Sequence, residues 1–255
     1  LTTGNWYNFS NPYFEWPEEE ATGGASDREN GSGVAGYYVY FGASESADIV
    51  TEGVYQTTTN FTPANLTAGQ TYYLSLKTKD EAGNISTTGT TPFVYKFNDQ
   101  KPDNPSTITV DPPGPSNINS YTVAWSGGSE DVQYCYKTGA IGATELCTDS
   151  TSVSSISAYQ EGNNLFYLRT KDVAGNYAAS YATVVYKLYQ TAPGPVENLR
   201  VTPDHSTSGE FYFAWSPPDY KGGSATQDTL KYYYSVNALP TASNVTLVGS
   251  QTYLP

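Results

Sequence analysis

The sequence has little of what most enzymes and most helical proteins are built from. Its 255 residues include no Met, one His and two Cys, and only 15% are charged. Runs rich in Ala, Leu, Glu and Lys, which favour helices, do not occur, whereas Tyr (24), Gly (23) and Pro (16) are abundant. Aromatic residues favour strands, and Gly and Pro favour turns. The composition therefore predicts an all-β protein, and the length predicts two or three domains of about 100 residues each.

Positive charge is also scarce. Twelve Lys and Arg residues stand against 25 Asp and Glu residues, which gives a formal net charge of −13. Nucleic acids and anionic membrane surfaces repel so acidic a chain unless a basic patch compensates, and the sequence shows no such patch. No run approaches the roughly 18 apolar residues of a membrane span. We therefore expect no nucleic-acid partner and no membrane insertion.

Motifs of common catalytic centres are missing as well. The chain has no Gly-x-Ser-x-Gly, no His-Glu-x-x-His and no phosphate-binding loop. Its single histidine, His205, lies in a polar segment far from both cysteines, which argues against a metal site built from His and Cys. The sequence predicts neither an enzyme nor a bound cofactor, and calcium is the one metal that needs to be weighed.

The two cysteines, Cys135 and Cys147, flank a Gly-containing turn between two β-prone runs. A hairpin there would place them opposite each other, so a disulfide is predicted. A pair of free, half-buried thiols is the alternative.

A repeat organises the chain. Residues 77–84 read KTKDEAGN and residues 169–176 read RTKDVAGN, an offset of 172 minus 80, or 92. The tripeptide VYK at 94–96 returns at 185–187, and a proline-rich joint follows each copy. Short runs of period two with no helical segment between them predict tandem antiparallel β-sandwiches. We expect modules at residues 1–102, 103–193 and 194–255.

Large aromatic residues mark the expected cores. Trp16, Trp125 and Trp215 each end an alternating run, and each is large enough to anchor a sandwich.

Several segments resemble the fibronectin type III family. PVENLRV followed by FYFAWSPPD looks like the first two strands of such a module, and LTAGQTY at 66–72 is similar to the approach to its sixth strand, F. The resemblance implies that Tyr72 forms a tyrosine corner. The Asp-x-Ala-Gly-Asn ending resembles the Ig-like and fibronectin-like repeats of bacterial surface and secreted proteins. Two departures are Ala68 in place of the usual Pro and Asn164 in place of the corner Tyr, so the second module resembles a more divergent Ig-like sandwich.

The spacing predicts modules that are incomplete at both ends. The third module is expected to be truncated before strands E to G, and strand A of the first module to be short or missing. More chain beyond this sequence, or strands donated by another chain, would complete the third sandwich.

The repeated Asp-x-Ala-Gly-Asn element has two interpretations. Its oxygen-bearing side chains are possible calcium ligands, but Glu81 becomes Val173 in the second copy, which weakens a metal site. A tight hairpin needs the Gly and uses the Asp and Asn to bond nearby amides. We therefore predict hairpin turns at Asp80, Gly83, Asn84, Asp172, Gly175 and Asn176. The acidic loop with Glu18, Glu19, Glu20, Asp27 and Glu29 is read as a solvated loop, with calcium or partner binding as its alternative.

Tyrosine clusters raise the question of sugar binding. Tyr38 and Tyr233 lie in the runs GYYVYF and KYYY and are the candidate glycan contacts. Stabilisation of the sheet by cross-strand aromatic pairs explains the same residues.

Together these features predict a non-catalytic spacer or adhesive segment of a larger extracellular or cell-surface protein. Its partners would be other modules of the same chain, and surface glycans or protein receptors. One alternative is an accessory carbohydrate-binding or stalk region of a secreted polysaccharide-degrading enzyme. The other is a self-assembling fibre subunit with donated strands.

Overall fold

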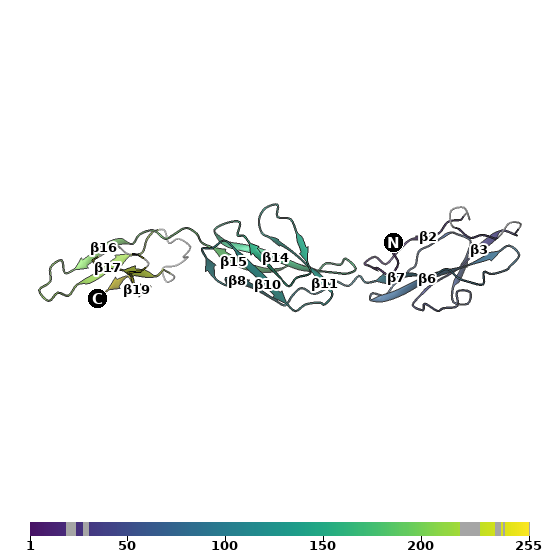
Figure 1. Cartoon of the computed structure of the whole chain (residues 1–255), viewed down its shortest axis with the longest axis horizontal. Helices are drawn as coiled ribbons and strands as arrows, with labels where there is room; N and C mark the ends of the chain where they lie inside the picture. Colours follow the sequence, from purple (N-terminus) through teal and green to yellow (C-terminus); the bar gives the residue numbers. More distant parts are fainter. Residues whose placement is uncertain (19–23, 28–30, 220–229, 238–240, 242, 255) are drawn as a thin grey trace.

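The computed structural model describes residues 1–18, 24–27, 31–219, 230–237, 241 and 243–254. In this part of the chain all regular structure is β-strand, arranged as three sandwiches that follow one another along an extended molecule (Figure 1). The predicted all-β class and tandem sandwich architecture are therefore confirmed. None of the described residues forms a helix that could cross a membrane.

Module 1 has one large and one small sheet. The large sheet has the order β1-β7-β6-β3-β4, in which only the β1–β7 pair is parallel, and β2 pairs with β5 in the small sheet. Its strands are β1 (Trp6–Tyr7), β2 (Phe14–Glu15), β3 (Val34–Gly42), β4 (Val54–Gln56), β5 (Asn60–Phe61), β6 (Gln70–Asp80) and β7 (Phe93–Phe97).

Module 2 repeats this arrangement with a complete second sheet. One sheet has the order β12-β11-β14-β15-β9, with β9 parallel to β15, and the other has the order β13-β10-β8. Its strands are β8 (Thr107–Asp111), β9 (Pro115–Ser116), β10 (Tyr121–Ser126), β11 (Val132–Thr138), β12 (Leu146–Thr148), β13 (Ser152–Ile156), β14 (Gly162–Asp172) and β15 (Ala182–Leu188). In chain order these are strands A, A′, B, C, C′, E, F and G of a fibronectin type III-like or Ig-like sandwich.

Module 3 contains β16 (Glu197–Thr202), β17 (Tyr212–Ser216), β18 (Tyr232–Tyr234), β19 (Thr246–Gly249) and β20 (Tyr253–Leu254). The order β16-β17-β20 matches strands A, B and E, and β18 pairs with β19 as C with C′. The expectation that this module stops before strand E is thus wrong in one detail, because β20 already pairs with β17. A recurrent hydrogen bond identifies strand E in each module. The backbone N–H groups of Trp16, Trp125 and Trp215 donate, in that order, to the carbonyls of Thr59, Thr151 and Thr252 at 2.9–3.0 Å.

The predicted module boundaries fall in the connections between sandwiches. Residue 102 lies between β7 and β8, and residue 193 between β15 and β16. The sequence predicts that strand A of module 1 is short or missing. The short strand β1 takes the position of A′, because it lies beside β7 as β9 lies beside β15. β2, which is strand B, pairs with β5, and no strand A pairs with it among the described residues.

Alternation of apolar residues builds each core. The module 1 core consists of Phe14, Tyr37, Val39, Leu74, Tyr95 and Phe97, and the module 2 core of Tyr121, Val123, Trp125, Phe166, Leu168 and Tyr186. Of the three expected anchors, Trp125 is buried, whereas Trp16 and Trp215 are only half-buried. Each tryptophan packs against a strand C tyrosine with ring centroids 5.4 Å apart, in the pairs Trp16–Tyr37, Trp125–Tyr134 and Trp215–Tyr232.

The start of strand F is fixed differently in the two complete copies. In module 1 the Tyr72 hydroxyl accepts a hydrogen bond from the Thr67 N–H at 2.7 Å, as a tyrosine corner requires. In module 2 the fully buried Asn164 takes this position. Its Oδ1 accepts from the backbone N–H groups of Tyr159 and Gln160, and its Nδ2 donates to the carbonyls of Gln160 and Gly162. A short amide side chain thus binds the same turn that the longer tyrosine reaches.

Candidate functional site

Both repeated hairpins are closed by their own side chains. The Asp80 carboxylate accepts from the Asn84 backbone N–H at 2.7 Å and from Asn84 Nδ2 at 2.8 Å. The corresponding distances from Asn176 to Asp172 are 2.8 and 2.9 Å. Gly83 and Gly175 have φ angles of +94° and +91°, which L-residues with a side chain rarely adopt. The hydrogen bond from the Asn84 side chain lowers the pKa of Asp80 below its usual value.

These contacts describe a preorganised turn. Each Asp carboxylate is directed at donors inside its own hairpin, which is the geometry that the hairpin interpretation requires. Among the described residues, no three His, Cys, Asp or Glu side chains converge to hold a metal ion. Glu19, Glu20 and Glu29 of the acidic loop lie outside those residues, and calcium binding there stays an untested prediction.

The second hairpin joins module 2 to module 1. Asn176 Nδ2 donates to the carbonyl of Asn98, just beyond β7, at 2.8 Å, and Asn98 Nδ2 donates to the Asp172 carboxylate at 3.2 Å. The connecting segment is also tied down. Asn104 Oδ1 accepts from the Thr170 N–H at 3.0 Å, and the Asp103 carbonyl accepts from the Thr170 hydroxyl at 3.0 Å. Modules 1 and 2 therefore meet through side-chain and backbone hydrogen bonds, in addition to the covalent linker.

The connection between modules 2 and 3 is anchored at its start. Glu161 Oε1 accepts from the backbone N–H groups of Gln190 and Thr191 and from the Thr191 hydroxyl, at 2.8–3.0 Å. The hydrogen bond from the Thr191 side chain is the largest cause of the lowered pKa of Glu161.

A disulfide fixes one edge of module 2. Cys135 of β11 and Cys147 of β12 are directly opposite in register and bonded, with Cα atoms 4.0 Å apart. The bridge pins the segment 139–145, which folds over the outer face of the sheet and carries Glu145.

An ion pair lies on that outer face. The Arg169 guanidinium binds the Glu145 carboxylate through two N–H groups at 2.8 and 2.6 Å, and the Tyr181 hydroxyl donates to the same carboxylate at 2.7 Å. The Arg169 hydrogen bond lowers the pKa of Glu145. The guanidinium also stacks 4.0 Å from the Tyr177 ring centroid and 4.8 Å from that of Tyr181. Such a shielded bidentate pair rigidifies the face.

Beside this pair lies a shallow cavity of about 360 Å³. Tyr167 and Tyr181 form one wall, with ring centroids 5.7 Å apart, and the Gly-containing segment 139–143 contributes another. Lys137 Nζ lies 4.9 Å from the Tyr181 centroid. An aromatic wall beside an ammonium donor can stack a sugar ring and bind its hydroxyls.

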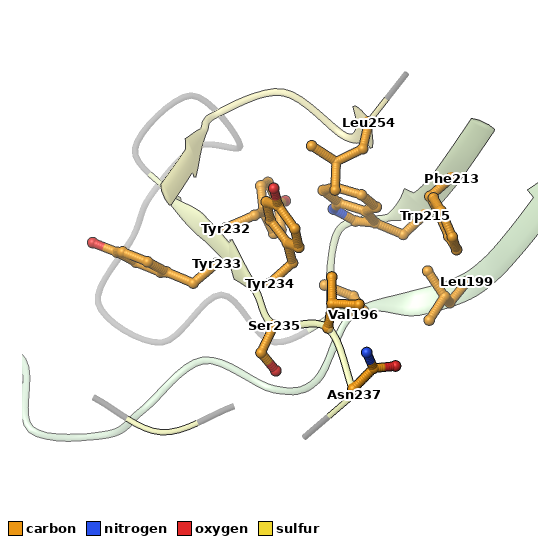
Figure 2. Close-up of a pocket in the computed structure, with 11 residues that line it drawn as sticks. Val196, Leu199, Phe213, Trp215, Tyr232, Tyr233, Tyr234, Ser235, Asn237 and Leu254 are labelled. Carbon is orange, nitrogen blue, oxygen red and sulfur yellow. The ribbon is translucent and has the colours of Figure 1, made fainter. Parts of the chain in front are cut away.

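The predicted glycan contacts occupy comparable faces in the other modules. Tyr38 packs against Tyr55 with centroids 5.3 Å apart, and Lys79 Nζ lies 5.4 Å from the Tyr55 centroid. Tyr233 of module 3 is 54% exposed and points away from the tyrosines on either side of it in β18 (Figure 2). The structure thus brings Tyr38 into an aromatic pair with a cation nearby, whereas no aromatic partner is found for Tyr233 among the described residues.

Module 3 has an open apolar face. The residues that line a cavity of about 590 Å³ include Leu199, Phe213, Trp215, Tyr232 and Leu254, which come from different strands of the module (Figure 2). Leu199 is 65% exposed. In module 2 the equivalent face is covered by strands F and G.

Several of these residues were missed by sequence analysis. Asn98, Glu145, Tyr177 and Tyr181 carry no motif, and their roles depend on loops folding over a sheet. One signal was present in the sequence. The segment YAASY at 177–181 directly follows the second hairpin, so it runs antiparallel to the strand that carries Arg169, and its two tyrosines can lie beside that residue.

Comparison with known proteins places similar segments in two bacterial enzymes. No protein-family model matches the chain. Exoglucanase B of Cellulomonas fimi is 31% identical over 175 residues, which cover 63% of this chain and 14% of the exoglucanase. Chitinase A1 of Niallia circulans is 28% identical over 173 residues, which cover 64% of this chain and 23% of the chitinase. The match thus takes in less than a quarter of the length of either relative.

Solved structures with overall similarity include two sets of fibronectin type III domains. The FN1–FN3 domains of chicken CNTN1 superpose with a TM-score of 0.41 at 13% identity, over 72% of this chain and 66% of that one. The fibronectin(III)-like modules of Clostridium thermocellum CbhA give a TM-score of 0.38 at 12% identity, over 73% and 91%. The assignment of the fold rests on the strand orders described above. The chain is a tandem of fibronectin type III-like sandwiches, and the expected resemblance to such repeats of bacterial secreted proteins is confirmed.

Proposed function

We propose that the chain is a non-catalytic spacer within a secreted bacterial polysaccharide-degrading enzyme, and that it holds the domains on its two sides at a set distance. The observation that carries the proposal is the hydrogen-bonded joint in which Asn98 of module 1 meets Asp172 and Asn176 of module 2. A freely hinged linker would not need reciprocal bonds between modules. The similarity to segments of an exoglucanase and a chitinase supports this context. The proposal places the chain outside the cell, where a disulfide such as Cys135–Cys147 persists.

The described residues offer little for catalysis. His205 contacts only the neighbouring Asp204, and both side chains are about nine-tenths exposed. Glu145 is held ionised by Arg169, so it is unsuited to act as a general acid. The proposal expects no release of reducing sugars from cellulose or chitin by the purified chain. Hydrolysis that co-purifies with the chain and is lost on Glu145→Gln would contradict it.

The spacer role predicts a narrow distance distribution between the far ends of modules 1 and 2. Spin labels at the exposed positions 81 and 118 report this distance by double electron–electron resonance. Asn176→Ala removes the bond to Asn98 and should broaden the distribution, whereas Val173→Ala, a substitution at an exposed position of the same turn, should leave it unchanged. An equally broad distribution in the unmodified chain would show that the joint does not act as a spacer.

Glycan binding is a second candidate, and the aromatic wall beside Lys137 is the observation that favours it. Together with Tyr38 and Tyr233, this wall gives three surfaces to test. Affinity electrophoresis in soluble glucan or glycol chitin should show retardation that Tyr181→Ala, Tyr38→Ala or Tyr233→Ala reduces, while Tyr212→Ala, on a different sheet, leaves it unchanged. Unchanged mobility of the wild-type chain at millimolar concentrations of sugar residues argues against the candidate. The relatives give no support for the adhesive role.

The open face of module 3 favours the remaining alternative, a fibre completed by donated strands. This alternative requires assemblies that grow with concentration. Light scattering that gives one monomer mass from micromolar to near-millimolar concentration would reject it.

A further inference from the structure

The same five-residue hairpin occurs twice, in two different surroundings. We call residues 80–84 the first turn and residues 172–176 the second turn. Their backbones match closely: in each, the Gly N–H donates to the Asp carbonyl at 3.1 Å, and the Asp N–H donates to the Asn carbonyl at 2.9–3.0 Å. The side-chain bonds that close the two turns differ by only 0.1 Å. The two turns therefore present the same polar groups in the same geometry.

The second turn is a docking surface whose occupant is known. Its Asn176 amide donates to the carbonyl that follows β7, and its Asp172 carboxylate accepts from the Asn98 amide. Asn8 Nδ2 approaches Gly175 so closely that a Cβ there would lie 3.7 Å from it. As a result Gly175 and Asn176 are half-buried. The occupant is the end of strand G of a sandwich, which offers one backbone carbonyl and one side-chain amide.

The first turn has no neighbouring sandwich docked on it among the described residues. Its own module does contact it, because the Glu81 N–H donates to the Gly33 carbonyl at 2.9 Å and the Ala82 N–H donates to the Ser32 hydroxyl oxygen at 3.2 Å. Neither bond uses the Asp80 carboxylate or the Asn84 side-chain amide. Residues 81–84 are exposed, and a Cβ at Gly83 would meet nothing within 4 Å. Asn84 Nδ2 donates to Asp80, and since an amide nitrogen carries two hydrogens, one remains for the role that Asn176 plays toward Asn98. The first turn thus keeps the donor and the carboxylate that the second turn uses.

From this we infer that the first turn is a docking site for the strand G end of another sandwich of this type, placed ahead of module 1 in a longer chain. The inference rests on the proposed spacer function and extends it: the Asp-x-Ala-Gly-Asn hairpin is the connector by which successive sandwiches are set in line. The partner is recognised by a free carbonyl just past its strand G and by an amide side chain at that position, as in Asn98.

Two sequence differences bear on the first turn. Glu81 replaces Val173, but Val173 is 65% exposed in the docked turn and so does not fill the contact. In addition, the Ser86 hydroxyl oxygen accepts a hydrogen bond from the Thr78 N–H, whereas in module 2 the corresponding Thr170 N–H donates to Oδ1 of the linker residue Asn104. Module 1 therefore satisfies this N–H internally, and its docking depends on Asp80 and Asn84 rather than on a linker side chain.

The first experiment uses the chain as it is. Val173→Glu converts the second turn into the sequence of the first, Asp-Glu-Ala-Gly-Asn. Residual dipolar couplings should then give one shared alignment tensor for modules 1 and 2, as in the wild type. Asn176→Ala is the disrupting control and should separate the tensors. If Val173→Glu separates the two alignment tensors as much as Asn176→Ala does, the inference is overturned. If the tensors of modules 1 and 2 already differ in the wild type, the spacer function is refuted instead.

The second experiment gives the first turn an occupant. Residues 1–109 are duplicated ahead of residue 1, so that a strand G end and its linker precede module 1. Segmental isotope labelling then separates three turns in one molecule: an unoccupied copy, the tested first turn and the docked second turn. Exchange of the Asn84 side-chain amide in the tested turn should slow by about fivefold or more relative to the unoccupied copy, as for an added hydrogen bond.

The exchange rates of the side-chain amides in the extended chain can also refute the inference. Equal exchange of Asn84 in the tested and unoccupied turns, with Asn176 still protected, overturns it. If the added sandwich does not fold, which the loss of its hydrogen bond from the Thr67 N–H to the Tyr72 hydroxyl would reveal, the Val173→Glu result decides.

Discussion

At the residue scale, one position shows how different side chains can solve the same problem. Tyr72 secures the turn before strand F with a single hydroxyl, whereas Asn164 secures its counterpart with four hydrogen bonds. The Asn side chain is fully buried, so each of its polar atoms depends on these bonds.

Replacing Asn164 should therefore destabilise module 2 strongly. Asn164→Ala leaves two N–H groups and two carbonyls of the turn without partners, and we expect a loss of about 3 kcal/mol or more in the free energy of unfolding. The matched change in module 1, Tyr72→Phe, removes one hydrogen bond and should remove only about 1 kcal/mol. Urea titration followed by tryptophan fluorescence measures both losses. Equal losses for the two variants would mean that the Asn network is not what holds the turn.

The buried tyrosines of strand G predict that the folded modules lose stability at alkaline pH. Burial raises the pKa of Tyr95 and of Tyr186 to about 12, from an ordinary value of 10. Because the folded-state pKa lies above the unfolded one, the contribution to stability is complete below pH 10 and is lost as the pH rises from 10 to 12. Absorbance titration should show these tyrosines ionising last, together with unfolding. Tyr186→Phe should move the alkaline midpoint of module 2 upward, and an unchanged midpoint would count against this account.

At the scale of strands and loops, sequence periodicity and spacing predicted most of what is regular. The alternation in Phe166, Leu168 and Thr170 identifies the buried side of β14, and all three are fully buried. The offset of 92 places both hairpins correctly, because a Gly with positive φ and an Asp–Asn pair specify a turn locally. The outer-face cluster around Arg169 could not be predicted in this way. It depends on segment 139–145 crossing the sheet, and no local pattern specifies that path.

At the scale of strands and loops, the prediction concerns the disulfide between β11 and β12. It closes a loop with a sequence separation of 12 and fixes the segment that carries Glu145. Replacing both cysteines by Ala should lower the free energy of unfolding of module 2 by about 2–3 kcal/mol. Calorimetry would show one transition move to lower temperature while that of module 1 stays in place. A shift of both transitions, or of neither, would be inconsistent with a bridge confined to module 2.

At the scale of the whole molecule, the sandwiches follow one another along one axis (Figure 1), and the contacts between modules 1 and 2 determine whether they act as a unit. Side-chain contacts such as Asn98 with Asp172 join residues 74 apart in sequence, which is why the repeat alone could not reveal them. The hairpin that first suggests a metal site is, in module 2, a connector.

Residual dipolar couplings of the unmodified chain test this central claim most directly. The account predicts that modules 1 and 2 share one alignment tensor, with equal magnitude and orientation, and that the double variant Asn98→Ala/Asn176→Ala splits it into two. Two independent tensors in the unmodified chain would contradict the account, because they would show that the joint is a hinge.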